Sequence, residues 1–183
     1  MKLTNLLCRK YSMTKVWDKL RDELSLSNST ELELRVCKWA SLIWPGLQRL
    51  GSCAALASLD KDGIDLVDGG GGASKLAVVI QCKGRLPPKP IAKEDIRAAE
   101  KSVTSFINSP YSCETYAFIH NSASGSADLY RELAQVVSRV SASGKAEQAF
   151  CWNIANFSNH LKQQLVLSIN RIDAIRQRRG GSS

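Results

Sequence analysis

Three polar residues near the middle of the chain, Asp65, Gln81 and Lys83, have types and spacing suited to phosphodiester hydrolysis. Residues two apart in a strand point to the same face, so Gln81 and Lys83 project together. A carboxylate and an amide oxygen are hard ligands suited to Mg²⁺, for which Mn²⁺ can substitute. An ammonium beside them can orient the attacking water or neutralise charge on the phosphate. Asp65 and Gln81 are therefore candidate metal ligands and Lys83 a candidate catalytic cation.

Two strands joined by a glycine-rich loop are predicted to bring these side chains together. Residues 63–67 are strand-like, Asp68 and four glycines follow, and Leu76–Cys82 is apolar and β-branched. This pattern predicts an antiparallel hairpin over residues 63–83, with residues 68–75 as its loop. The glycine run lacks the Gly-Lys-Ser/Thr ending of a P-loop and the spacing of a dinucleotide fingerprint, which argues against nucleotide binding there.

Helices and further strands are predicted on both sides of the hairpin. Thr30 is a candidate N-cap, with Glu33 completing a capping box, for a helix that ends at Pro45-Gly46. The order of elements indicates an α/β fold with a mixed central sheet flanked by helices. We expect one domain over residues 30–170, preceded by a basic arm with a short helix (1–29) and followed by a basic flexible tail (171–183). Periodicity predicts further helices at 16–24, 92–108, 127–141 and 159–171, and strands at 56–59, 115–120 and 150–154.

Composition favours a nucleic-acid partner over a membrane. The chain has 25 Lys and Arg against 17 Asp and Glu, and this net charge of +8 attracts polyanions, although ordinary solubility accounts for it equally well. No apolar run approaches the roughly 20 residues needed to cross a bilayer. The basic start of the chain suits a transit-like presequence or, as we prefer, an arm or first helix.

The numbers and spacing of the cysteines and histidines argue against some kinds of metal or redox site. The six cysteines form no CxxC pair, so they are expected to be reduced thiols of a cytoplasmic protein. Only two histidines are present, His120 and His160, which leaves little scope for a histidine-rich metal site.

The sequence around the candidate site resembles a known family. Residues 62–67 (DGIDLV) and 78–84 (VVIQCKG) are similar to the Mrr-like branch of the PD-(D/E)XK nucleases, in which Q-x-K commonly replaces E-x-K. The resemblance covers residues 30–120 and implies a helix, three-strand, helix, strand core with Mg²⁺-dependent hydrolysis of DNA. Such domains often serve restriction or other defence against foreign DNA. In that family a Glu on the first core helix often completes the metal site, and Glu33, or failing that Glu31, occupies this place.

Departures from the family pattern leave a second function open. The usual Pro before the first acid is absent, the stretch from Glu33 to Gly51 is longer than the family's compact helix, which weakens the assignment of Glu33, and Gln81 carries no charge. The alternative is a catalytically inactive nuclease-fold module that binds nucleic acid or a partner protein. The resemblance also implies action as a homodimer or with a partner ATPase or targeting subunit. Candidate contacts to the DNA backbone, each of which could instead belong to a solvated helix surface, are Arg85, Lys89, Lys93, Arg97 and Lys101.

Overall fold

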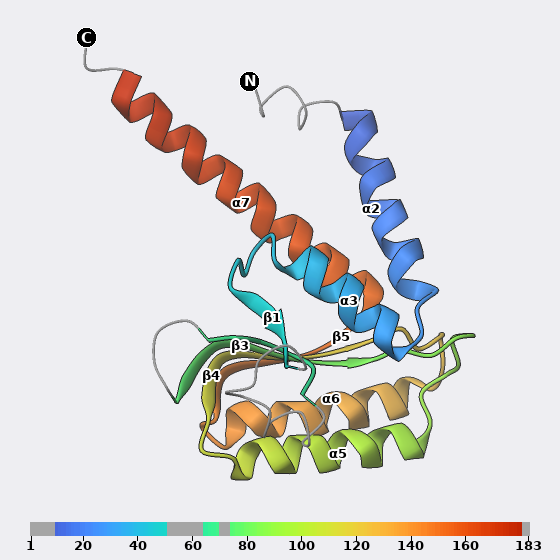
Figure 1. Cartoon of the computed structure of the whole chain (residues 1–183). Coiled ribbons are helices and arrows are strands. Elements are labelled where there is room, and N and C mark those ends of the chain that lie inside the picture. Colours follow the sequence, from blue (N-terminus) through green and yellow to red (C-terminus); the bar gives the residue numbers. More distant parts are fainter. Residues whose placement is uncertain (1–9, 51–63, 70–73, 181–183) are drawn as a thin grey trace.

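A five-stranded mixed sheet separates two layers of helices in the computed structural model, which describes residues 10–50, 64–69 and 74–180 (Figure 1). The order of elements confirms the α/β class with a mixed sheet flanked by helices. In chain order the elements are α2 (Lys10–Ser25), α3 (Ser29–Ala40), β1 (Leu47–Arg49), β2 (Leu66–Asp68), β3 (Lys75–Lys83), α5 (Lys93–Asn108), β4 (Ser112–His120), α6 (Ala127–Ala142), β5 (Ala146–Asn153) and α7 (Ile154–Gly180).

The strands lie in the sheet in the order of the sequence, from β1 to β5. β1, β2 and β3 are antiparallel neighbours, whereas β3, β4 and β5 run parallel. The predicted hairpin is confirmed, with Leu66 opposite Ile80 and Val67 opposite Val79. Because β3, β4 and β5 are parallel, their carboxyl ends meet at one edge of the sheet, and α5 and α6 return the chain across one face.

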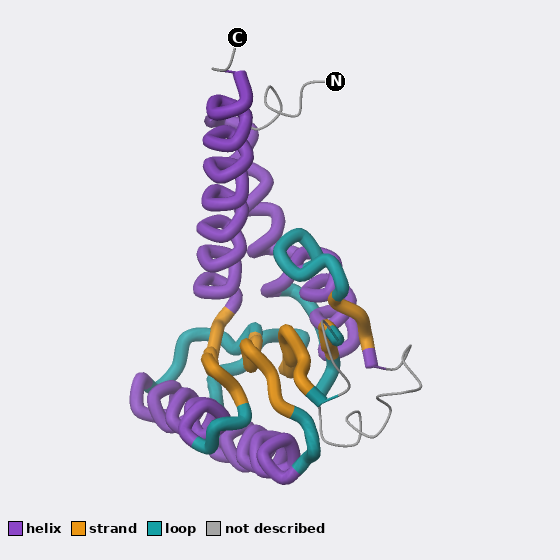
Figure 2. The backbone as a smooth tube through the Cα atoms, turned by 90° about the vertical axis from the view of Figure 1, so that its left-hand side faces the viewer, coloured by secondary structure: helices purple, strands orange, loops and turns teal. Residues whose placement is uncertain are grey.

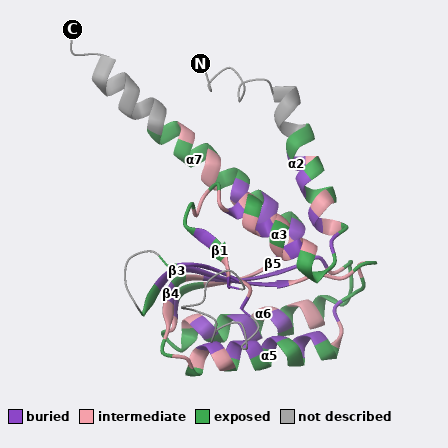
Figure 3. Cartoon of the chain, viewed as in Figure 1, coloured by how far each residue is buried: buried purple, intermediate pink, exposed green. Residues whose placement is uncertain are grey.

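Each face of the sheet carries its own apolar core (Figure 3). Val79 and Tyr116 point to the face covered by α5 and α6, where they meet Phe106. Val78 and Ile80 point to the opposite face, covered by α2, α3 and α7. The two-residue period of β3 therefore sets which of its polar residues face which helical layer.

The first core helix begins earlier in the sequence than predicted. Its N-cap is Asn28 rather than Thr30, and Glu31 rather than Glu33 completes the capping box. The Asn28 side chain accepts from the N–H of Glu31 at 3.0 Å, and the Glu31 carboxylate accepts from the N–H of Asn28 at 3.1 Å. An amide cap fits this geometry as well as a hydroxyl does, so spacing alone did not distinguish the two registers.

The next stretch also differs from the prediction, because α3 ends at Ala40 and residues 47–49 form β1. A strand of three residues is too short to show an alternating pattern in the sequence. The strand predicted at 56–59 lies outside the described residues.

The two ends of the described chain are helices that rise away from the sheet (Figure 2). α2 belongs to the core rather than to a separate arm, since Trp17, Leu20 and Leu24 are buried with α3 and α7. α7 begins at Ile154 rather than at residue 159, and residues 171–180, expected to be a flexible tail, continue the helix to Gly180. Residues 171–179 contain neither Gly nor Pro to interrupt it. None of the helices in the described ranges has an apolar stretch long enough to cross a membrane.

Candidate active site at the end of strand β3

The structure places Asp65 beside the end of β3, the strand that carries Gln81 and Lys83. The N–H of Asp65 donates to the carbonyl of Ile80 at 3.1 Å, so the chain is already paired with β3 one residue before β2. The Asp65 carboxylate accepts from the N–H of Cys82 at 2.5 Å, between Gln81 and Lys83. The acid thus stands directly before β2, within the stretch 63–67 that was predicted to be strand-like. The antiparallel pairing still places it beside the end of β3.

Gln81 is held in a buried network on the face covered by α5. Its Nε2 donates to the hydroxyl of Ser102 at 2.8 Å, and its Oε1 accepts from the hydroxyl of Tyr116 at 3.2 Å. The Ser102 hydroxyl donates to the carbonyl of Ala98, so its oxygen is left to accept, which fixes the orientation of the amide. Burial raises the pKa of Tyr116, and Cys113 and Asp65 add to the increase, so the phenol stays a donor. One lone pair of Gln81 Oε1 remains for another partner.

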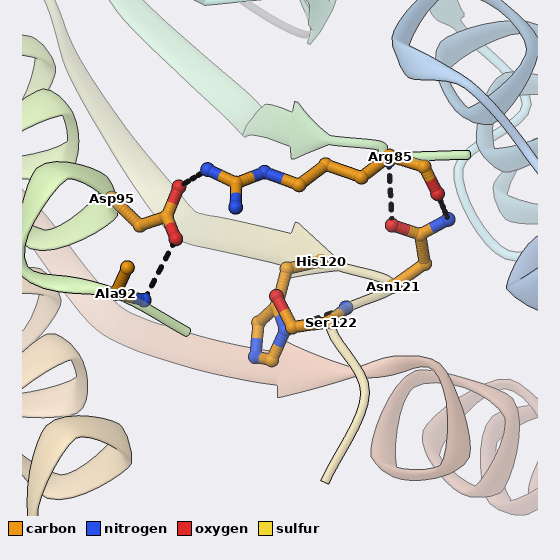
Figure 4. Close-up of polar contacts among 6 residues, drawn as sticks. All are labelled: Arg85, Ala92, Asp95, His120, Asn121 and Ser122. Atoms are coloured by element: carbon orange, nitrogen blue, oxygen red, sulfur yellow. Dashed lines mark hydrogen bonds and ion pairs between the residues drawn. The ribbon is translucent and has the colours of Figure 1, made fainter. Parts of the chain in front are cut away.

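Lys83 ends β3 with a half-buried side chain and lies opposite His120 in register. Within the described ranges its ammonium makes no ion pair. Arg85, two residues later, pairs instead with the buried Asp95, which also accepts from the N–H of Ala92 at the start of α5 (Figure 4). Lys83 is therefore the cation available to a ligand at this strand end, whereas the guanidinium of Arg85, a predicted DNA contact, stabilises the start of α5.

Glu33 lies beside the hairpin but is paired with an arginine. Its carboxylate is 3.0 Å from Nη2 of Arg49 in β1. Burial raises the pKa of Cys82 well above its usual value, and the charges of Asp65 and Glu33 raise it further, so both acids lie near this thiol. The other candidate, Glu31, belongs to the capping box at the start of α3. Glu33 is thus the better placed of the two, although Arg49 already neutralises it.

The oxygen atoms at this strand end suit a hard divalent ion that keeps several waters. No group of three or more His, Cys, Asp or Glu in the part of the chain that the structure describes is arranged to hold a metal. The donor set is instead one carboxylate, from Asp65, and one amide oxygen, from Gln81. Mg²⁺ usually retains several waters and takes one or two protein carboxylates, so this set fits it.

The other predicted basic contacts do not converge on this strand end. Lys89 is exposed in the connector before α5, and Lys93, Arg97 and Lys101 are exposed at four-residue intervals along that helix. With Arg139 of α6, Arg97 and Lys101 line an open cleft of about 730 Å³. Because this cleft also contains the loop that precedes β4, it lies towards the amino ends of the parallel strands. The α5 cations therefore form a line that leads away from Lys83.

Asn121 is a structural residue of the site that the sequence did not reveal. Its Nδ2 donates to the carbonyls of Ser25, Ser27 and Arg85 at 3.1, 2.7 and 3.1 Å, and its Oδ1 accepts from the N–H of Arg85 at 2.8 Å. These bonds join the α2–α3 connection to the residues that follow β3. A single Asn after a strand is common in turns, so its type gave no signal.

Gly84, next to the candidate cation, provides a direct test of this packing. A Cβ on Gly84 would lie 2.4 Å from the carbonyl oxygen of Asn28, whereas one on Gly69 would meet nothing within 4 Å. We expect Gly84→Ala to lower the free energy of unfolding by about 2–4 kcal/mol, because backbone must shift to relieve the overlap. Gly69→Ala is the matched control and is expected to change it by less than about 1 kcal/mol. Urea unfolding followed by circular dichroism measures both, and equal stability of the two variants would contradict the contact.

Comparison of the chain with protein-family models, with curated proteins and with solved structures gives no match. Assignment of a function therefore depends on the residues and geometry described above.

Proposed function

We propose that the protein is a metal-dependent DNA endonuclease of the PD-(D/E)XK type, and that it hydrolyses phosphodiester bonds at the end of β3. The observation that carries the proposal is the hydrogen bond from the N–H of Cys82 to the Asp65 carboxylate. It holds an acid between an amide and an ammonium on neighbouring strands. The order α3, β1, β2, β3, α5, β4 agrees with the core that the family resemblance implies.

The three side chains have separate roles in this proposal. Asp65 and Oε1 of Gln81 would hold the Mg²⁺, and the Ser102 and Tyr116 contacts keep the amide in place. When bound, the ion supplies Lewis-acid activation of water and neutralises charge on the phosphate. Lys83 contributes an ammonium that stabilises the negative charge on the phosphate oxygens as it increases in the transition state. Exposed Lys93, Arg97 and Lys101 hold the DNA backbone along α5 as it leads away from the site, in keeping with the net charge of +8.

The proposal is tested by cleavage of plasmid and linear DNA in Mg²⁺ or Mn²⁺. We expect cleavage that stops on addition of EDTA. Lys83→Ala should reduce the rate by about 100-fold or more, the usual loss when one donor to a developing charge is removed. Lys75→Ala is the matched control: it removes a lysine from the other end of β3, where the ammonium is exposed and pairs with Glu147. Equal cleavage by the Lys83→Ala and Lys75→Ala proteins would refute the role of Lys83.

Three contacts favour a second candidate function, a nuclease-fold module that binds DNA without cutting it. Arg49 neutralises Glu33, and the amide of Gln81 already has partners at both of its polar atoms. Such a module would bind DNA with an affinity that falls steeply with salt, yet leave it intact in every metal. Binding without cleavage by the wild-type protein would establish this second function in place of the first.

A further inference from the structure

A polar pocket lies at the carboxyl ends of β4 and β5, beside the proposed catalytic residues but separate from them. Lys83, His120 and Asn153 are neighbours in register at the ends of β3, β4 and β5. His120 and Asn153 line the pocket, whose volume is about 530 Å³, together with the loop that follows β4 and the first residues of α6 and α7. A volume of this size is in the range of small-molecule sites. None of the lining residues is Lys, Arg, Asp or Glu.

The buried imidazole of His120, one of the residues that line this pocket, has an unused donor. His120 is only 2% exposed, and its Nδ1 accepts from the N–H of Ser122 at 3.4 Å (Figure 4). Burial lowers the pKa of His120 to about 4, so the ring is neutral at pH 7. A neutral imidazole whose Nδ1 accepts must carry its proton on Nε2. That Nε2 is buried and has no hydrogen-bond partner among the described residues. Buried donors are normally paired, so this one points to an acceptor supplied by a ligand.

The first residues of two helices, α6 and α7, line the same pocket. The side chain of Ser126 caps one N–H of α6 and that of Asn153 caps one N–H of α7. The first N–H groups of each helix, including those of Ala127, Ile154 and Ala155, have no acceptor within their helix. α7 has 27 residues and no acid in its first turn. The one acid in the first turn of α6, Asp128, is 85% exposed and paired with Arg131.

Several polar groups around the pocket already have hydrogen-bond partners in the protein, and those without partners indicate which ligand would fit. Asn121 has partners for both its amide oxygen and its amide nitrogen. The Tyr130 hydroxyl donates to the carbonyl of Cys151. The groups left over are mainly donors, from His120 and from the first turns of α6 and α7. Donors that come from three elements around one pocket suit an oxyanion, and helix N-termini are established sites for phosphate.

We propose that this pocket binds a phosphate monoester, either of a free nucleotide or of the 5′ end of a nucleic acid, through His120 Nε2–H and the first turns of α6 and α7. The oxygens of the tetrahedral phosphate accept hydrogen bonds from these donors, and the remaining volume of the pocket holds the attached nucleoside. The proposal does not depend on cleavage at β3, although a terminal phosphate bound here would place a strand end next to Lys83.

The test follows the two histidines by NMR in protein labelled with ¹⁵N-histidine. We expect inorganic phosphate and thymidine 5′-monophosphate to shift the imidazole signals of His120 in a saturable way. His160, which is stacked with Trp44 and tilted against Trp152 and does not line the pocket, is the internal control and should not respond. No shift at His120, or equal shifts at both histidines, would overturn the proposal.

Two variants that add the same charge at different places test whether phosphate binds in this pocket. Ala155→Asp places an acid at the start of α7, where it favours the helix but repels a phosphate, and should weaken binding at least tenfold. Ala142→Asp adds the same charge at the far end of α6, about 22 Å along that helix, and should leave binding unchanged. Equal affinity of the Ala155→Asp and wild-type proteins would refute the site.

Oligonucleotides distinguish a pocket for the 5′ end of a nucleic acid from a pocket for a free nucleotide. A short 5′-phosphorylated strand should shift His120 more than the same strand with a 5′-hydroxyl if the site takes nucleic-acid ends. A response to the mononucleotide alone assigns the pocket to free nucleotides, and a response to neither overturns the proposal. The Lys83→Ala protein should retain the response, so loss of cleavage and loss of phosphate binding are separate results.

Discussion

Replacing Asp65 with Asn is expected to reduce Mg²⁺-dependent DNA cleavage by on the order of 1000-fold while leaving the fold intact. The substitution removes the only carboxylate in the proposed donor set, and loss of about 4 kcal/mol of transition-state stabilisation corresponds to this factor. The amide oxygen of Asn can still accept from the N–H of Cys82, as the carboxylate does at 2.5 Å. Initial cleavage rates of the two proteins, measured at saturating Mg²⁺, test this expectation.

Asp128→Asn is the matched control for this experiment. Asp128 lies in the first turn of α6, and its side chain is 85% exposed and paired with Arg131, so the substitution removes the same charge outside the proposed donor set. Its cleavage rate and thermal midpoint should stay close to those of the wild type. If the Asp65→Asn protein cut DNA as fast as the control, Asp65 would not be a metal ligand and the proposed mechanism would fail.

The parts of the fold that the sequence predicted are those with long, regular patterns. The apolar stretch of β3 and the apolar spacing of α5 and α6 belong to elements of at least nine residues, and the structure confirms these elements. The three-residue β1 and the early start of α7 were not predicted. A short strand has no measurable period, and Ile154 continued an apolar strand pattern that gave no sign of a helix start.

The sequence predicted which residues form the candidate site, but it did not predict the contacts that these residues make. A two-residue period is enough to place Gln81 and Lys83 on one face, and the hairpin adds Asp65. The pairing of Glu33 with Arg49 could not be predicted in the same way, because it depends on the unpredicted strand β1. The contacts of Gln81 with Ser102 and Tyr116 span 21 and 35 residues of sequence, so no local pattern encodes them. Such contacts depend on how α5 and β4 pack against β3.

Removal of the Asn121 side chain is expected to have the largest effect on stability, because this amide joins three segments that are distant in sequence. Asn121→Ala would remove four hydrogen bonds and leave the carbonyls of Ser25, Ser27 and Arg85 without this donor. A fully buried group that is left unsatisfied costs about 1–3 kcal/mol, and only the bond to Ser27 is fully buried, so we expect a total loss of about 3–5 kcal/mol. For a domain of this size the thermal midpoint should fall by roughly 10 °C.

Two further variants test whether the loss of stability comes from the hydrogen bonds of Asn121 or would follow from any substitution of an asparagine. Asn108→Ala alters an exposed Asn at the end of α5 and should change the midpoint by less than about 2 °C. Asn121→Asp keeps an oxygen for the N–H of Arg85 but turns a carboxylate towards three carbonyl oxygens. It should therefore destabilise the protein more than Asn121→Ala at neutral pH. If Asn121→Asp were instead the milder change, the hydrogen bond that Oδ1 accepts from the N–H of Arg85 would be the dominant interaction. The bonds to Ser25 and Ser27 would then not be what holds the α2–α3 connection against the end of β3.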